Sequence, residues 1–200
     1  MKEEIDLELP LNYPKSLLES LEYELGKFDI TVKSRERDLG VMAAIEWTIP
    51  TQIMIYMAAA FSTSFLTEAG KDTYKEIRNA LKKFITTNHA IKTKIITSSG
   101  SPDKLSKSYD QSLSISMRVK LHQRIALTVL FPDIMPKEEA DAMLDGLFDS
   151  LKAIKKELSA ESNQNLQQTQ IQLFLIADPN KKSWVMLDSK QMMDKYRNKS

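Results

Sequence analysis

The chain has 200 residues, of which 42% are hydrophobic and 28% are charged, and its formal net charge is +1. These proportions exclude an intrinsically disordered protein, which would have fewer apolar residues and a larger net charge. The absence of cysteine excludes disulfides, thiolate zinc sites and a cysteine nucleophile. The length suits one domain, comprising residues 1–200, with its own hydrophobic core.

The first quarter of the chain predicts one helix and a pair of strands. Residues 1–12 are interpreted as an extended N-terminus, and Pro14 is placed to open a helix that ends near Gly26. Apolar and polar residues alternate over 30–35, and an apolar segment returns over 41–48 after a polar turn. This arrangement predicts a hairpin.

The longest helical pattern begins at Pro50 and runs to about residue 85. Nine successive residues from Ile53 are apolar, which predicts a helix that is buried on all sides. From Lys71 the pattern is amphipathic, and Gly70 lies between the two halves. We therefore expect a long central helix that either bends near Gly70 or projects from the body of the protein.

The second half of the chain contains the clearest alternation. Strands are predicted at 91–95, 113–121, 125–131, 171–177 and 184–187, with a loop at 98–108 and a helix from Pro136 to about residue 158. Residues 189–200 predict an exposed C-terminal tail or a short helix. The whole pattern predicts an α+β fold in which a mostly antiparallel sheet of about six or seven strands packs against helices.

Residues 47–67 form an uncharged segment of 21 residues between Glu46 and Glu68. That length matches a membrane-spanning helix, but its unbroken apolar part is only about half as long as a span requires. A buried helix is the preferred interpretation, with a membrane anchor or an assembly surface as alternatives. The N-terminal residues lack the apolar core of a secretory signal, so we expect a cytoplasmic protein.

Two groups of basic residues are candidates for binding anions. Residues on or beside predicted strands could form an anion or nucleic-acid patch, or simply the ordinary solvated face of a sheet: Lys92, Lys94, Arg118, Lys120 and Arg124. A second group follows one stripe of the long helix: Lys71, Lys75, Arg78 and Lys82. Acidic residues form the neighbouring stripe of that helix, so we interpret this second group as an ordinary mixed, solvated face.

The sequence contains no motif for a metal, a nucleotide or a catalytic nucleophile. The two histidines, at 89 and 122, do not form a ligand pair. Asp141, Asp145 and Asp149 share one helical face that could hold a divalent cation, although such a row is more typical of a solvated surface. We therefore expect no cofactor and no metal site.

The favoured functional hypothesis is a non-catalytic binding or assembly protein, a small cytoplasmic subunit or inhibitor-like partner that acts through protein–protein contacts or homo-oligomerises. Trp47, Met192 and Met193 are the candidate contact residues, because aromatic and methionine side chains suit such surfaces. The alternatives are a membrane-associated effector anchored by residues 47–67 and a nucleic-acid-binding module that uses a basic sheet face. An enzyme is a further alternative, for which no residue is proposed.

Overall fold

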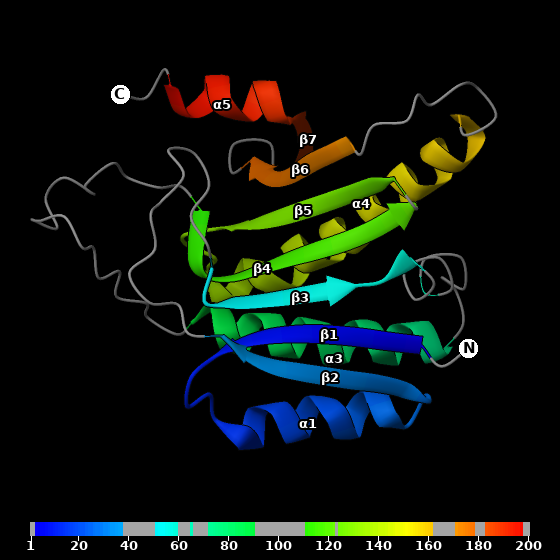
Figure 1. The fold of residues 1–200 in the computed structure, drawn as a ribbon, viewed down its shortest axis with the longest axis vertical. Helices are drawn as coiled ribbons and strands as arrows, with labels where there is room; N and C mark the ends of the chain where they lie inside the picture. The colour runs from blue at the N-terminus through cyan, green and yellow to red at the C-terminus, as the bar shows by residue number, and fades with distance from the viewer. Residues whose placement is uncertain are drawn as a thin grey trace, which may run out of the picture.

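A single seven-stranded sheet organises the part of the chain that the computed structural model describes, namely residues 3–37, 51–59, 65, 72–90, 111–122, 124–161, 171–178 and 183–197. The strands are β1 (Glu3–Pro10), β2 (Ile30–Arg37), β3 (Ile53–Met57), β4 (Gln111–His122), β5 (Ile125–Pro132), β6 (Ile171–Asp178) and β7 (Ser183–Asp188). The helices are α1 (Lys15–Gly26), α3 (Asp72–His89), α4 (Lys137–Glu161) and α5 (Ser189–Arg197). The strand order is β2-β1-β3-β4-β5-β6-β7 (Figure 1).

The fold is α+β, but the prediction of a mostly antiparallel sheet is wrong. Parallel and antiparallel pairs alternate across the sheet, with β1–β2, β3–β4 and β5–β6 parallel and the other three pairs antiparallel. Each parallel pair is joined through a helix, which returns the chain to the end of the sheet where the first strand began. The described neighbour of β2 is therefore β1, and residues 41–48 of the predicted hairpin lie outside the described residues.

The prediction of one long helix over 50–85 is also wrong, because residues 53–57 form strand β3 in the interior of the sheet. Every residue of β3 is apolar or aromatic, and periodicity alone cannot distinguish such a continuous run from a buried helix. The second half of the pattern does form a helix, α3, but Gly70 lies outside the described residues. None of the described helices combines the length and hydropathy that crossing a bilayer requires.

The N-terminal segment is an interior strand rather than an extension. Ile5, Leu7 and Leu9 of β1 are buried, and they alternate with acidic residues that point to the opposite face. β1 pairs with β2 on one side and with β3 on the other. The sheet therefore begins at residue 3 and depends on the first ten residues of the chain.

The two faces of the sheet have different coverings. Helices α3 and α4 lie behind the sheet in Figure 1, and the main core fills the space between those helices, α1 and the apolar side chains of the strands. On the other face, α5 covers only the β6–β7 side of the sheet, where Met192 packs with Leu130, Phe174 and Ile176. Over β1 to β4, the described side chains of that face are mostly polar or charged, apart from Met54 and Tyr56 of β3.

The remaining predicted elements have mixed outcomes. The helix ending near Gly26, the strands over 113–121, 125–131, 171–177 and 184–187, the helix from Pro136 and a short C-terminal helix are all confirmed. The predicted strand at 91–95 and loop at 98–108 lie outside the described residues.

Candidate functional site

The register of the sheet determines which side chains meet on the face that α3 and α4 leave open. One row across the strands contains Lys33 of β2, Asp6 of β1, Tyr56 of β3 and Arg118 of β4. Directly paired strand residues have side chains on the same face and within contact distance. The row therefore places an acid and an aromatic ring between two basic side chains.

A groove of about 740 Å³ lies on this face of the sheet. Its lining includes Ala58 and Ala126, which leave space beside Lys120, the register partner of Ala126. Among the described residues, the charged side chains of the lining are five basic and one acidic: Lys33, Arg35, Arg118, Lys120, Arg124 and Asp6. We call this hollow the basic groove.

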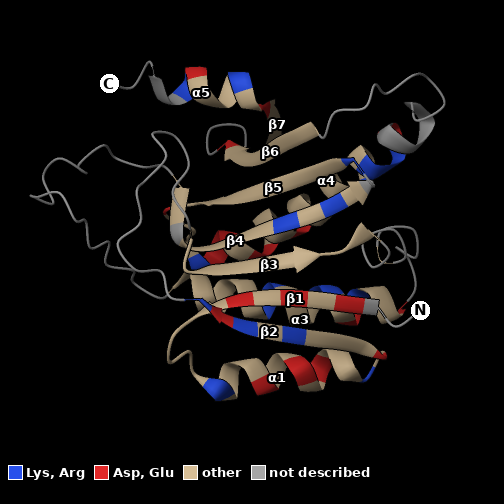
Figure 2. Cartoon of the chain, in the orientation of Figure 1, with Lys and Arg blue, Asp and Glu red and all other residues tan. Residues whose placement is uncertain are grey.

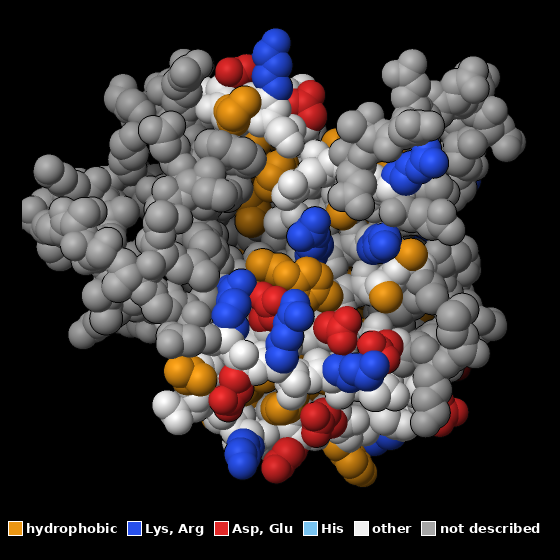
Figure 3. Space-filling model, in the orientation of Figure 1, with side chains coloured by type: hydrophobic (Ala, Val, Ile, Leu, Met, Phe, Trp, Pro, Cys, Tyr) orange, Lys and Arg blue, Asp and Glu red, His pale blue; other side chains and the backbone are white. Residues whose placement is uncertain are grey.

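Charge on the open face is sorted by strand, with acidic residues on β1 and basic residues on β2 and β4 (Figure 2). In the space-filling view, Lys and Arg side chains lie on both sides of the hydrophobic side chains over β3, whereas acidic side chains gather on the β1 side (Figure 3). The groove therefore has two basic walls that differ in their surroundings. The β2 wall, formed by Lys33 and Arg35, lies beside the acids of β1, whereas the β4–β5 wall is formed by Arg118, Lys120 and Arg124.

The basic residues of β2 are held by the acids of β1. Lys33 Nζ lies 2.6 Å from a carboxylate oxygen of Glu4, and this hydrogen bond raises the pKa of Lys33 above its ordinary value. Glu8, which is only 7% exposed, accepts from Arg35 and lies 2.8 Å from Arg37 Nη1. These contacts orient the β2 wall but neutralise much of its charge.

The basic residues of the β4–β5 wall have a different surrounding. Arg118, Lys120 and Arg124 are all exposed. The neighbouring strand β3 has the sequence IMIYM, which carries no charge, and it separates β4 from the acids of β1 by two strand spacings, about 10 Å. Within the described part of the chain, Arg118 forms no ion pair.

Three of the five residues predicted as an anion patch meet in the basic groove, namely Arg118, Lys120 and Arg124. Lys92 and Lys94 lie outside the described residues. Sequence reasoning missed Lys33, Arg35 and Tyr56, although the alternation of β2 does place Lys33 and Arg35 on one face. What the sequence does not reveal is that β2 and β4 lie in the same sheet with β1 and β3 between them.

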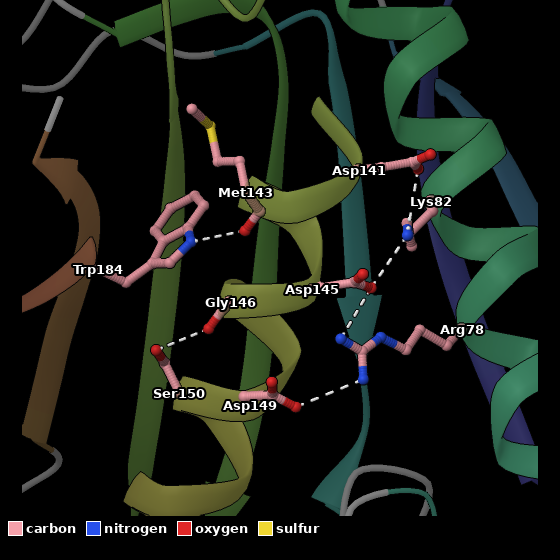
Figure 4. A network of polar contacts seen from close by, with 9 residues as sticks. All are labelled: Arg78, Lys82, Asp141, Met143, Asp145, Gly146, Asp149, Ser150 and Trp184. Carbon is pink, nitrogen blue, oxygen red and sulfur yellow. Dashed lines mark hydrogen bonds and ion pairs between the residues drawn. The ribbon is translucent and has the colours of Figure 1, made fainter. Parts of the chain in front are cut away.

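The second basic group has a structural role. Arg78 and Lys82 of α3 face α4, where Arg78 lies 2.8 Å from Asp145 and 3.4 Å from Asp149 (Figure 4). Lys82 lies 3.1 Å from Asp141 and 2.9 Å from Asp145. We call these five residues the α3–α4 ladder.

The interpretation of this basic stripe as a solvated face is wrong for Arg78 and Lys82, whose side chains are 16% and 12% exposed. Lys75 does remain exposed, with Asp72 of its own helix 3.3 Å away, and Lys71 lies outside the described residues. Among the described residues, no three His, Cys, Asp or Glu side chains are placed so that they could hold one metal ion.

The ladder determines the ionisation of its central carboxylate. Partial burial opposes the charge on Asp145, but the hydrogen bond from Lys82 and the charges of Arg78 and Lys82 outweigh it. The pKa of Asp145 is therefore held below its ordinary value of 3.8. The carboxylate is charged at neutral pH and serves the contact between the two helices.

The opposite side of α4 is tied to the sheet. Trp184 of β7 donates its indole N–H to the carbonyl oxygen of Met143 at 2.9 Å, and its ring lies edge-on to Phe131 with centroids 6.0 Å apart. A Cβ atom added at Gly146 would lie 3.8 Å from the Trp184 ring, so the helix passes close to β7. α4 therefore contacts α3 on one side and Trp184 of β7 on the other (Figure 4).

The predicted partner residues are not grouped on one surface. Met192 is 0% exposed and belongs to the small core beneath α5, so its prediction as an exposed contact is wrong. The amphipathic α5 turns this methionine toward the sheet, whereas Met193 is 43% exposed. Trp47 lies outside the described residues. Protein–protein assembly stays a prediction, with Met193 as its one exposed contact residue among those described.

No family model, curated protein or solved structure matches this chain. The fold and the side chains of the basic groove are therefore the basis for inferring its function.

Proposed function

We propose that the protein is a binding protein that holds a polyanionic ligand in the basic groove. The observation that carries the proposal is the charge of the described lining, which includes five basic side chains and one acidic side chain around a hollow of about 740 Å³. A volume of that size lies within the ordinary range of ligand sites, about 300–1,000 Å³.

A net charge of +1 does not oppose this proposal. The total is a sum over the whole chain, in which the ladder pairs Arg78 and Lys82 with three aspartates away from the groove. A local excess of one sign of charge in a concave surface attracts ligands of the opposite sign, whatever the net charge of the protein.

The two walls suit different tasks in binding. Lys33 and Arg35 are already oriented by Glu4 and Glu8, so they lose little side-chain freedom when a ligand arrives. Arg118 is exposed and has no ion pair within the described part of the chain, so it provides net positive charge to the ligand. Binding on this wall releases counterions from a polyanion and is expected to weaken with salt.

Titration with inorganic polyphosphate, which carries charge but no bases, tests the proposal. We expect the wild-type protein to bind it, and the Arg118→Ala/Lys120→Ala double variant to bind at least about tenfold more weakly, because two phosphate contacts are lost. Calorimetry measures both affinities, and circular dichroism confirms that the variants are folded.

The matched control is Lys152→Ala/Lys156→Ala, which removes the same charge from two exposed positions of α4. Because α4 covers the opposite face of the sheet, this variant should bind polyphosphate as the wild type does. Equal losses in both double variants, or no binding by the wild type, would refute the proposal.

A further inference from the structure

We infer that the ligand of the basic groove is a single-stranded nucleic acid, with a base stacked on Tyr56 beside Arg35 and its edge hydrogen-bonded to Asp6. This inference rests on the proposed function and specifies the chemistry of its ligand. Three features of the groove carry it: the separation of the basic walls, the aromatic ring between them and the single carboxylate.

The basic side chains of the two walls are spread over several strands of the sheet. Lys33 and Arg118 belong to the same cross-strand row, but three strand spacings separate their strands, which is about 14 Å. Lys33 is already paired with Glu4, so its charge and that of Arg118 are presented at separate places on the sheet. The arrangement suits a chain that carries several negative charges and crosses the groove.

Tyr56 lies between these walls, in register with Asp6 on one side and Arg118 on the other. It is the one aromatic residue of the described lining, and its ring is only half-buried. The guanidinium of Arg35 lies over the ring, 5.8 Å from its centroid, and is anchored by Glu8. Aromatic rings and arginine planes are the two surfaces on which proteins stack unpaired bases, so Tyr56 and Arg35 offer adjacent stacking surfaces.

Asp6 distinguishes nucleic acid from other polyanions. A carboxylate in the floor of an anion site repels phosphate and the side chains of an acidic peptide, so it weakens binding of ligands that carry only negative groups. A base has N–H donors on its edge, and aspartate accepts hydrogen bonds from donors such as the amino group of cytosine. Asp6 is the register partner of Tyr56 and therefore lies beside a base stacked there.

The stacking requirement selects a single strand. In a duplex the faces of the bases are covered by their neighbours, and only a strand with splayed bases can place one on a side chain. Sequence-tolerant proteins of this kind combine a positively charged groove with aromatic stacking. The basic groove has both properties within one row of side chains.

Fluorescence anisotropy with labelled oligonucleotides of about 12 nucleotides tests the inference, since sites of this kind span about 4–16 nucleotides. We expect single-stranded oligo(dC) or oligo(rC) to bind more tightly than a duplex of the same length or poly-glutamate. Tyr56→Ala should lower the affinity about tenfold, whereas Tyr56→Phe, which keeps the ring, should bind as the wild type does. The comparison of dC with rC strands identifies which sugar the groove prefers.

Asp6→Ala provides a second signature that a folding defect cannot imitate. Removing the carboxylate removes both its negative charge and its hydrogen-bond acceptor. The affinity for every oligonucleotide should therefore rise, while the preference for oligo(dC) over oligo(dT) should decrease about fivefold or more. An unchanged preference would overturn the assignment of Asp6.

The outcomes separate this inference from the proposed function. If Tyr56→Ala binds single strands as the wild type does, or if duplex and poly-glutamate bind equally well, the nucleic-acid inference is wrong. The proposed function still holds in that case, provided that Arg118→Ala/Lys120→Ala weakens the binding of polyphosphate. If that double variant weakens no ligand, both are wrong.

Discussion

The α3–α4 ladder and the basic groove contain similar basic residues in opposite situations. Arg78 and Lys82 are largely buried and face three aspartates across a helix contact. Arg118 and Lys120 are exposed on a strand whose neighbour β3 carries no charge. The role of a basic residue is therefore determined by the element packed beside it rather than by its own sequence neighbours.

The difference follows from how the elements are placed. α4 crosses beside α3 so that the aspartate spacing of one helix matches the basic spacing of the other, and the charges neutralise each other (Figure 4). In the sheet, β3 lies between the acidic strand β1 and the basic strand β4. The helix pair therefore forms a structural contact, whereas the sheet separates the basic residues of β4 from the acids of β1.

Charge reversal in the groove should have the largest effect. Arg118→Glu/Lys120→Glu replaces attraction by repulsion at two adjacent positions on the same face of β4, so we expect polyphosphate affinity to fall more than about 100-fold at low salt. The melting temperature should stay close to that of the wild type because both side chains are exposed. Calorimetric titration and thermal melts measure the two effects; a large loss of stability would place these residues with the ladder instead.

Removing Arg78 from the α3–α4 ladder should lower the stability of the protein and leave its affinity for polyphosphate unchanged. Arg78→Ala loses two ion pairs and the contact of the guanidinium with Phe148, 5.6 Å from the ring centroid, and we expect unfolding to become easier by about 1–3 kcal/mol. Lys75→Ala on the same helix is the control, since its exposed pair with Asp72 should contribute less than about 0.5 kcal/mol. Equal urea midpoints for the two variants would show that the ladder does not stabilise the helix contact.

Acid titration should give a smaller effect. Because the folded-state pKa of Asp145 is lowered, its stabilising contribution is fully present above its ordinary value of 3.8 and is lost as the pH falls through the lower folded value. We expect about 0.5 kcal/mol from this half-exposed group. Asp145→Asn lacks the contribution at every pH, so its stability deficit relative to the wild type should shrink below pH 3.8. Urea unfolding measured across this range checks the sign, and a constant deficit would contradict it.

Local sequence patterns predict much of this fold. Apolar and polar residues alternate, or nearly alternate, along each strand from β4 onward, and α1, α4 and α5 each have one apolar face. The same rule applied to Ile5, Leu7 and Leu9 would have found β1, whose acidic side chains conceal an ordinary alternation. β3 could not be found in this way, because all five of its residues are apolar or aromatic, including Met54 and Tyr56 on the open face, so the strand lacks that contrast.

The candidate site was predictable only in part, for a related reason. Arg118 and Lys120 share a strand, so their common face follows from a spacing of two residues. Lys33 and Tyr56 join them only through the order and direction of β2, β1, β3 and β4, which depend on contacts between distant parts of the chain. The ladder shows the same limit, since neighbours within a helix are visible in the sequence but neighbours across two helices are not.

The salt dependence of polyanion binding tests most directly whether the basic groove contacts phosphates. For single strands, the slope of log affinity against log salt is about −0.7 for each phosphate that the protein neutralises. Arg118→Ala/Lys120→Ala should therefore make the slope shallower by about 1.4, while Lys152→Ala/Lys156→Ala leaves it unchanged. A slope that is the same in all three proteins would mean that the ligand binds elsewhere, and the basic groove would not be the binding site.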